Sequence, residues 1–79
     1  MDNLEIKNMT IQELTKEKLR AGFTPEELGQ SWGVSYAMIS RYKTGYSNPS
    51  LQVAIIIYKL TKEVIYPFSK EAVQNERHA

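Results

Sequence analysis

The chain of 79 residues contains no cysteine, so it can form neither a disulfide bond nor a thiolate metal site. Long hydrophobic runs are also missing. The longest apolar stretch, residues 53–58, is far shorter than the roughly 20 residues that a membrane-spanning helix needs. The first residues lack the basic region of a signal peptide. These absences argue against a secreted fold and lead us to expect a soluble, cytoplasmic protein without a membrane partner.

Residues that carry catalysis are equally scarce. The single histidine, His78, lies near the end of the chain, with no acid or nucleophile at a fixed spacing. Glu26 and Glu27 are explained by helix capping rather than by acid–base chemistry. The sequence has no glycine-rich phosphate loop and no cluster of spaced metal ligands. We therefore expect no enzymatic activity, no cofactor, no metal and no small-molecule ligand.

Acidic residues are missing from one long window of the sequence. None of the nine Asp and Glu residues lies between residues 28 and 62, although the net charge of the whole chain is only +1. The window contains four basic residues: Arg41, Lys43, Lys59 and Lys62. Such a distribution favours a surface that faces phosphate groups. The alternative is a chance clustering of charge on a solvated face.

Caps and apolar spacing predict an all-α fold, a compact bundle of about five short helices. We expect one domain over residues 10–75, with tails at 1–9 and 76–79, and a small strand at Leu4 and Ile6 as an alternative for the first tail. The expected helices span residues 10–21, 25–32, 36–44, 51–61 and 69–74. A chain of this size buries only about 60% of its unfolded surface, so dimerisation would add stability.

The second and third of these helices form a helix-turn-helix pattern. Thr24, Pro25 and Glu27 make a capping box with proline at the first helical position, and Gly33 ends that helix. Ser35 then caps the third helix. The apolar face of the second helix is expected to comprise Phe23, Leu28 and Trp32, with Gly29 allowing another helix to approach. The apolar face of the third comprises Met38, Ile39 and Tyr42.

These residues resemble a known family. The positions that carry the resemblance are Leu28, Gly29, Gly33-Val34-Ser35, Ile39-Ser40-Arg41, Gly45 and Asn48-Pro49-Ser50-Leu51. Their spacing is similar to that of the Cro/repressor (XRE-type) helix-turn-helix family, over roughly residues 10–60. The resemblance implies a lambda-repressor-like fold and a transcriptional regulator, such as a small phage or prophage repressor, that binds operator DNA as a homodimer.

The outer face of the helix over residues 36–44 provides the candidates for reading bases in the major groove. They are Tyr36, Ala37, Ser40 and Arg41, which also match base-contacting positions of the family. Arg41 is the strongest candidate, because a guanidinium can donate two hydrogen bonds to guanine O6 and N7. The alternative is a surface salt bridge for Arg41 and packing on its own helix for Tyr36.

Phosphate contacts are expected from polar and basic residues around this helix and from free amides at the start of the second helix. The candidates are Thr24, Ser35, Lys43, Thr44, Tyr46, Ser47 and Asn48. Two positions depart from the family pattern. Pro25 replaces a glutamine that braces the recognition helix, and Lys18 and Lys43 replace a basic–acidic pair.

The helix over residues 51–61 is apolar on two faces, so both must be covered. Leu51, Ala54, Ile55 and Tyr58 are assigned to one face. We expect the other face and the segment after it to form a dimer interface, comprising Val53, Ile56, Ile57, Leu60, Ile65 and Phe68. Alternatively, the C-terminal residues of the same chain cover this face. A second function that remains open is a protein-interaction module, antitoxin-like or an adaptor, that uses the 51–61 surface.

Overall fold

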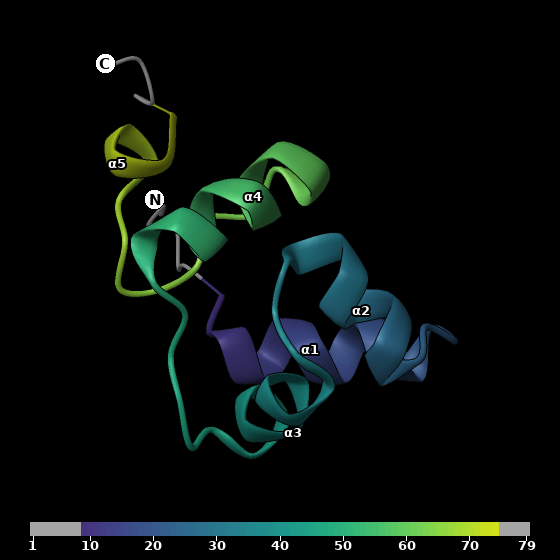
Figure 1. Cartoon of the computed structure of the whole chain (residues 1–79). Coiled ribbons are helices and arrows are strands. Elements are labelled where there is room, and N and C mark those ends of the chain that lie inside the picture. The colour runs from purple at the N-terminus through teal and green to yellow at the C-terminus, as the bar shows by residue number, and fades with distance from the viewer. Residues whose placement is uncertain (1–8, 75–79) are drawn as a thin grey trace, which may run out of the picture.

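The structure, a computed structural model, describes residues 9–74, which fold into five helices (Figure 1). In chain order these are α1 (Ile11–Arg20), α2 (Pro25–Trp32), α3 (Tyr36–Thr44), α4 (Leu51–Thr61) and α5 (Lys70–Gln74). The predicted all-helical class is confirmed. Outside the helices, the described residues also contain an isolated parallel bridge between Met9 and Ile65.

Side-chain caps determine where the helices begin. Thr10 Oγ1 accepts a hydrogen bond from the Glu13 amide at 3.1 Å, and the Glu13 carboxylate accepts one from the Thr10 amide at 3.0 Å. Thr24 and Glu27 form the same reciprocal pair, at 3.1 and 2.8 Å. Each pair satisfies two amides that the first helical turn leaves without a partner. Both capping boxes follow from residues three apart in the sequence.

The core lies where α1 and α2 pack against α3. The buried rings of Trp32 and Tyr42 pack together within it, with centroids 6.4 Å apart and planes tilted by 42°. Burial raises the pKa of the Tyr42 phenol above its ordinary value, because an ionised phenolate would lose its hydration there. The buried residues of this cluster are Ile11, Leu14, Leu28, Trp32, Ile39, Tyr42, Ile57 and Ile65.

Phe23 does not join this core, although its spacing from Leu28 and Trp32 predicts that it would. Its side chain is 48% exposed, and the Lys18 ammonium lies 5.8 Å from the centre of its ring. Phe23 precedes the α2 cap, so helical periodicity does not govern its direction. Leu28 and Trp32, which lie within α2, are buried as expected.

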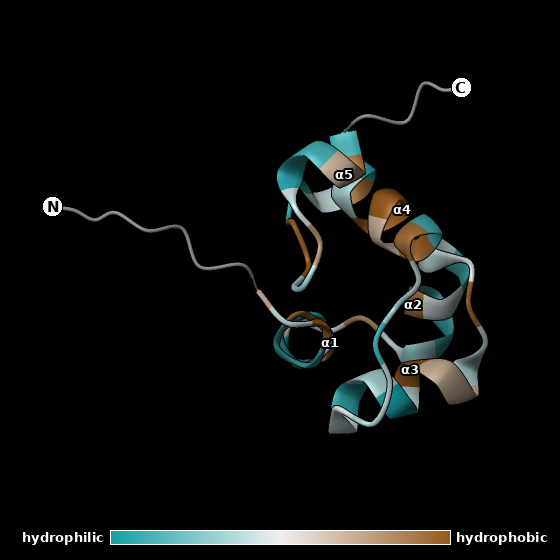
Figure 2. Ribbon diagram, turned by 90° about the vertical axis from the view of Figure 1, so that its left-hand side faces the viewer, coloured by the Kyte–Doolittle hydropathy of each residue, from teal (hydrophilic) through white to brown (hydrophobic). Residues whose placement is uncertain are grey.

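Helix α4 packs on α2, and α5 packs on α4. Figure 2 shows α4 as a predominantly hydrophobic helix at the opposite end of the molecule from α3. Val73 of α5 is buried, and the Gln74 side-chain amide donates to the Tyr58 hydroxyl at 3.1 Å. The C-terminal segment of the same chain therefore covers part of the α4 surface.

The prediction that Ile57 and Ile65 lie at a dimer interface is wrong, because both side chains are 0% exposed within a single chain. Ile57 follows Ala54 by three residues and shares its core-facing side of α4, rather than the side that carries Ile56. Val53 and Phe68 are half-buried, whereas Ile56 and Leu60 are 36% and 59% exposed. Ile56 and Leu60 therefore present apolar surface to solvent, whereas Val53 packs against the core of the same chain.

Met9, placed by the sequence pattern in an N-terminal tail, is half-buried, and its carbonyl accepts a hydrogen bond from the Tyr66 amide at 2.9 Å. The possible strand at Leu4 and Ile6 lies outside the described residues, as do His78 and the expected tail over residues 76–79. None of the described helices is long and apolar enough to cross a lipid bilayer.

Candidate nucleic-acid interface

The turn between α2 and α3 is held by short backbone contacts. Gly33 adopts the left-handed conformation, with φ 75° and ψ 31°, and its amide and that of Val34 both donate to the Gly29 carbonyl, at 2.8 and 2.9 Å. A Cβ on Gly29 would lie 2.7 Å from the Val34 carbonyl oxygen. The close approach predicted at Gly29 is therefore made by the backbone of the turn and not by another helix.

This turn presents one face of α3 to solvent. Ile39 and Tyr42 are buried and Met38 is half-buried, which agrees with the predicted inward face. Figure 2 shows α3 along the lower edge of the molecule, away from α4 and α5. All four predicted base-reading residues are exposed: Tyr36, Ala37, Ser40 and Arg41.

Arg41 carries the only guanidinium on α3, and no carboxylate of the described residues lies within salt-bridge distance of it. Its Cζ atom lies 5.9 Å from the centre of the Tyr46 ring. The surface salt bridge considered as an alternative role is therefore not present among residues 9–74. Tyr36 is 60% exposed, so its ring is available to a ligand of this face.

Lys43 lies on the side of α3 that faces α1 and the start of α2. A surface hollow there is lined by Lys43 together with Leu19, Pro25, Tyr36, Ile39 and Ser40. Lys43 has no ion-pair partner among residues 9–74, so its charge is free to meet an anion.

The start of α2 offers less to an anion than its position implies. The Thr24 amide is taken by the Glu27 carboxylate, the Glu27 amide by Thr24 Oγ1, and Pro25 has no amide hydrogen. Glu26 and Glu27 also place two negative charges in the first turn. The free amides that led us to expect a phosphate contact at Thr24 are therefore largely absent.

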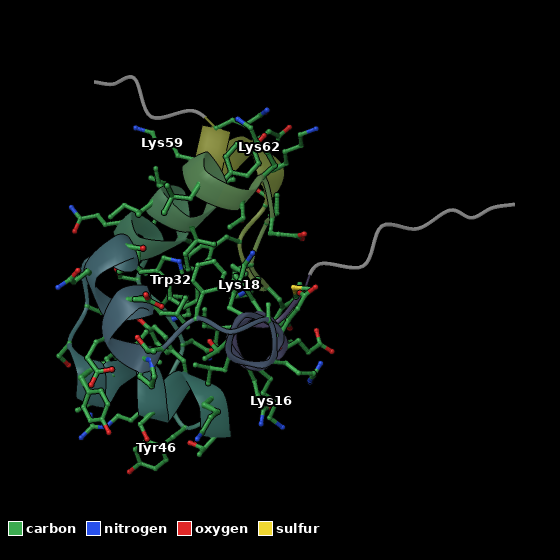
Figure 3. The ribbon with its side chains drawn as sticks, turned by 90° about the vertical axis from the view of Figure 1, so that its right-hand side faces the viewer. Lys16, Lys18, Trp32, Tyr46, Lys59 and Lys62 are labelled. Carbon is green, nitrogen blue, oxygen red and sulfur yellow. The ribbon has the colours of Figure 1, made fainter. Side chains whose placement is uncertain are left out.

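The acid-free window of the sequence does not form one surface. Lys59 and Lys62 lie at the end of the molecule opposite Tyr46, which marks the α3 end (Figure 3). The Lys62 ammonium lies 5.5 Å from the centre of the Tyr58 ring, on α4. Only Arg41 and Lys43 of the four basic residues belong to the α3 face. The interpretation of the window as one phosphate-facing patch is wrong, because α4 leads the chain away from α3.

Lys16 is a basic residue that the sequence analysis missed. It is exposed on α1 and lies toward the same end of the molecule as Tyr46 (Figure 3). Gln12, one turn earlier on α1, lies beside Gly45 at the end of α3, since a Cβ on Gly45 would be 3.0 Å from its Oε1. Only the packing of α1 against α3 brings these residues together, and no local sequence signal indicates it.

The remaining predicted phosphate contacts lie in the loop after α3 and at the two ends of α3. Asn48 is exposed, Ser47 is half-buried, and Tyr46 is 79% exposed. The Thr44 hydroxyl donates to the Arg41 carbonyl at 3.2 Å. Ser35 Oγ accepts from the Met38 amide at 3.1 Å as the α3 cap. Pro49, which follows Asn48 in this loop, is buried.

The described residues contain no group of three or more His, Cys, Asp or Glu side chains that could hold a metal ion. What the α3 face offers is an exposed set of hydroxyl, guanidinium and ammonium donors on one helix. Such a face, on a helix held by a tight turn against a second helix, defines a helix-turn-helix DNA-binding domain.

Comparison with known proteins gives the same class. A family model described as helix-turn-helix matches residues 14–62, from within α1 to the residue after α4. The chain belongs to this XRE-type helix-turn-helix family and is a DNA-binding regulator. No curated protein and no solved structure matched the chain in the corresponding searches.

Proposed function

We propose that the chain is a small Cro-like repressor of the phage or prophage type, which binds operator DNA as a homodimer with α3 in the major groove. The observation that carries this proposal is the outer face of α3, where Arg41 is exposed and has no carboxylate partner among the described residues. A helix with such a face has the width and the donors needed to read base edges.

In this proposal the base edges are read by Tyr36, Ala37, Ser40 and Arg41. Arg41 donates to guanine O6 and N7, while Ala37 and the Tyr36 ring make apolar contact with a thymine methyl group. Lys43, Ser47 and Asn48 contact phosphates, and Lys16 adds a further cation at the same end of the molecule. Few such contacts are available in one subunit, so two subunits are needed for a tight complex.

A second candidate function is that of a protein-interaction module. It is favoured by the stripe of Val53, Ile56 and Leu60 on α4, whose members lie three and four residues apart and are at least partly exposed. The same stripe is the expected homodimer interface, so its apolar character alone does not separate the two functions.

Selection of bound duplexes from a random-sequence library tests the proposal. We expect an enriched sequence with two-fold symmetry and half-sites about 10 base pairs apart, one helical turn of DNA. On the selected duplexes we expect Lys43→Ala to weaken binding, because it removes a phosphate contact. Lys59→Ala is its control, because it removes the same charge at the far end of the molecule (Figure 3). Binding without any enriched sequence, or no binding at all, would favour the interaction module instead.

A further inference from the structure

The end of α3 has a hydrogen-bond pattern that fixes where Tyr46 lies. Gly45 is left-handed, with φ 79°, and its amide donates to the Tyr42 carbonyl at 3.1 Å. The Tyr46 amide donates to the Arg41 carbonyl at 2.9 Å. These two bonds form a Schellman motif, in which the residue after the glycine folds back onto the residue five positions earlier.

In Schellman motifs this return frequently brings two apolar side chains together. Here it brings an aromatic ring to a guanidinium, with 5.9 Å between Arg41 Cζ and the centre of the Tyr46 ring. Tyr46 is 79% exposed, more than any other large hydrophobic side chain of the described residues, so core packing does not explain its position. The contact is a cation–π interaction at the surface.

The contact leaves the hydrogen-bonding capacity of Arg41 intact. The ring attracts the guanidinium through its face, so the N–H donors of Arg41 are not consumed as they would be in a salt bridge with a carboxylate. No such carboxylate lies within reach among residues 9–74. A long, flexible side chain is thereby held near one position while its donors remain free, which lowers the entropy lost on binding.

We propose that Tyr46 is a positioning residue for Arg41: its ring holds the guanidinium at the end of the α3 face so that it meets a guanine in the bound site. This inference rests on the proposed function, because it assumes that Arg41 reads a base. It gives Tyr46 a different role from the phosphate contact that the sequence led us to expect.

The contact between the Tyr46 ring and the Arg41 side chain is tested without DNA. The ring current of Tyr46 displaces the side-chain proton resonances of Arg41 in the NMR spectrum, and we expect Tyr46→Phe to keep this displacement and Tyr46→Leu to abolish it. The exposed position of Tyr46 makes both variants compatible with folding, which circular dichroism verifies. Arg41 resonances that do not move in Tyr46→Leu would overturn the proposal, whatever the protein does with DNA.

The positioning role is tested by a double-mutant cycle on a selected operator. We expect Tyr46→Leu to lower discrimination at the base pair read by Arg41 by about two- to fivefold, the factor that corresponds to an exposed cation–π contact. Tyr46→Phe should keep wild-type discrimination. In an Arg41→Ala background, Tyr46→Leu should have no further effect, because the ring then has nothing to hold.

Two outcomes of the cycle would overturn the proposal. Equal losses for Tyr46→Phe and Tyr46→Leu on specific and random DNA would assign the tyrosine hydroxyl to a phosphate. Equal effects of Tyr46→Leu with and without Arg41 would show that the two residues act independently. A wild-type protein that prefers no sequence would overturn both this inference and the proposed function, whereas a selective protein with an additive cycle overturns this inference alone.

Discussion

Thr15 places a hydroxyl group inside the domain. Its side chain is 0% exposed on α1, and its Oγ1 is a buried atom without a hydrogen-bond partner among the described residues. A buried hydroxyl that lacks a partner costs about 1–3 kcal/mol of stability through lost hydration. Apart from this atom, the interior described above is apolar or aromatic, so Thr15 is a position where a substitution can raise stability.

We expect Thr15→Val to raise the free energy of unfolding by about 1 kcal/mol, because it exchanges the hydroxyl for a methyl group in the same space. Urea unfolding followed by circular dichroism measures the change. Thr15→Ser is the matched control: it keeps the hydroxyl and deletes the methyl group, so it should lower stability. A Thr15→Val protein less stable than wild type would show that the hydroxyl has a partner in solution.

Arg41 and Lys43 differ in what their removal should change. We expect Arg41→Ala to weaken binding of the selected operator by about 1–3 kcal/mol and to relax the preference at one base pair. Lys43→Ala should weaken binding to all sequences similarly and make the salt dependence shallower by about one phosphate contact. Fluorescence anisotropy on matched and mismatched duplexes over a range of salt measures both. An unchanged base preference in Arg41→Ala would contradict its reading role.

At the scale of the elements, what the sequence predicts well is set by near neighbours. The starts of α1 to α4 follow from Thr10, Thr24, Ser35 and Ser50, whose side chains bond to amides three residues further on. The left-handed Gly33 and Gly45 are equally local. The outward face of α3 could therefore be predicted residue by residue.

What the sequence could not settle depends on contacts between distant segments. Ile56 and Ile57 are adjacent isoleucines, and only the packing of α2 and α5 on α4 decides that Ile57 is buried. Lys59 and Lys43 share an acid-free window, yet Lys59 lies at the end of the molecule opposite Tyr46, which follows the α3 helix that carries Lys43 (Figure 3). The contact between Arg41 and Tyr46 could be predicted in part from the sequence. A glycine followed by tyrosine at a helix end indicates a Schellman motif, which brings the tyrosine back to the last turn of the helix.

The α2–α3 turn provides the element-scale prediction. Gly29→Ala would place a Cβ 2.7 Å from the Val34 carbonyl oxygen, which is backbone and cannot move without disturbing the turn. We expect a loss of about 1–2 kcal/mol in the free energy of unfolding, despite the higher helix propensity of alanine. Gln30→Ala, on the exposed side of the same helix, should change stability by less than about 0.5 kcal/mol.

Thermal and urea unfolding of the two variants measure the difference, and operator binding at a temperature where both are folded adds a second readout. Because Gly29 sets how α3 leaves the turn, its alanine variant should bind more weakly than Gln30→Ala even when fully folded. Equal stability for Gly29→Ala and wild type would mean that the turn relaxes at no cost.

At the scale of the whole molecule, the α3 face lies at one end, and α4 and α5 lie at the other (Figures 1 and 2). An operator of two half-sites requires two α3 helices about 34–36 Å apart, which a two-fold dimer supplies. Because Ile57 and Ile65 are buried within the single chain, the dimer that we propose would have to use the exposed Ile56 and Leu60, beside the half-buried Val53. Fewer residues can therefore form the proposed dimer interface, and a single substitution at Ile56 is enough to test it.

Ile56 is the centre of the stripe, 36% exposed, with its Cδ1 atom beside Gly33 in the α2–α3 turn. In a single chain, a glutamate at this position can extend its carboxylate into solvent, so Ile56→Glu should fold. Across a two-fold interface the same carboxylate would be desolvated and would lie near its symmetry mate, which is costly. We therefore expect Ile56→Glu to be a helical monomer that binds the operator much more weakly than wild type.

Sedimentation and circular dichroism measure assembly and helix content, and Gln52→Glu is the matched control, because it adds the same charge one turn earlier on an exposed part of α4. We expect the control to remain dimeric, since a carboxylate at a polar rim position keeps its hydration. If Ile56→Glu stays dimeric and helical, the subunits associate through another surface. If it unfolds while Gln52→Glu does not, Ile56 serves the fold of the single chain, and the partly exposed stripe belongs to the same core as Ile57.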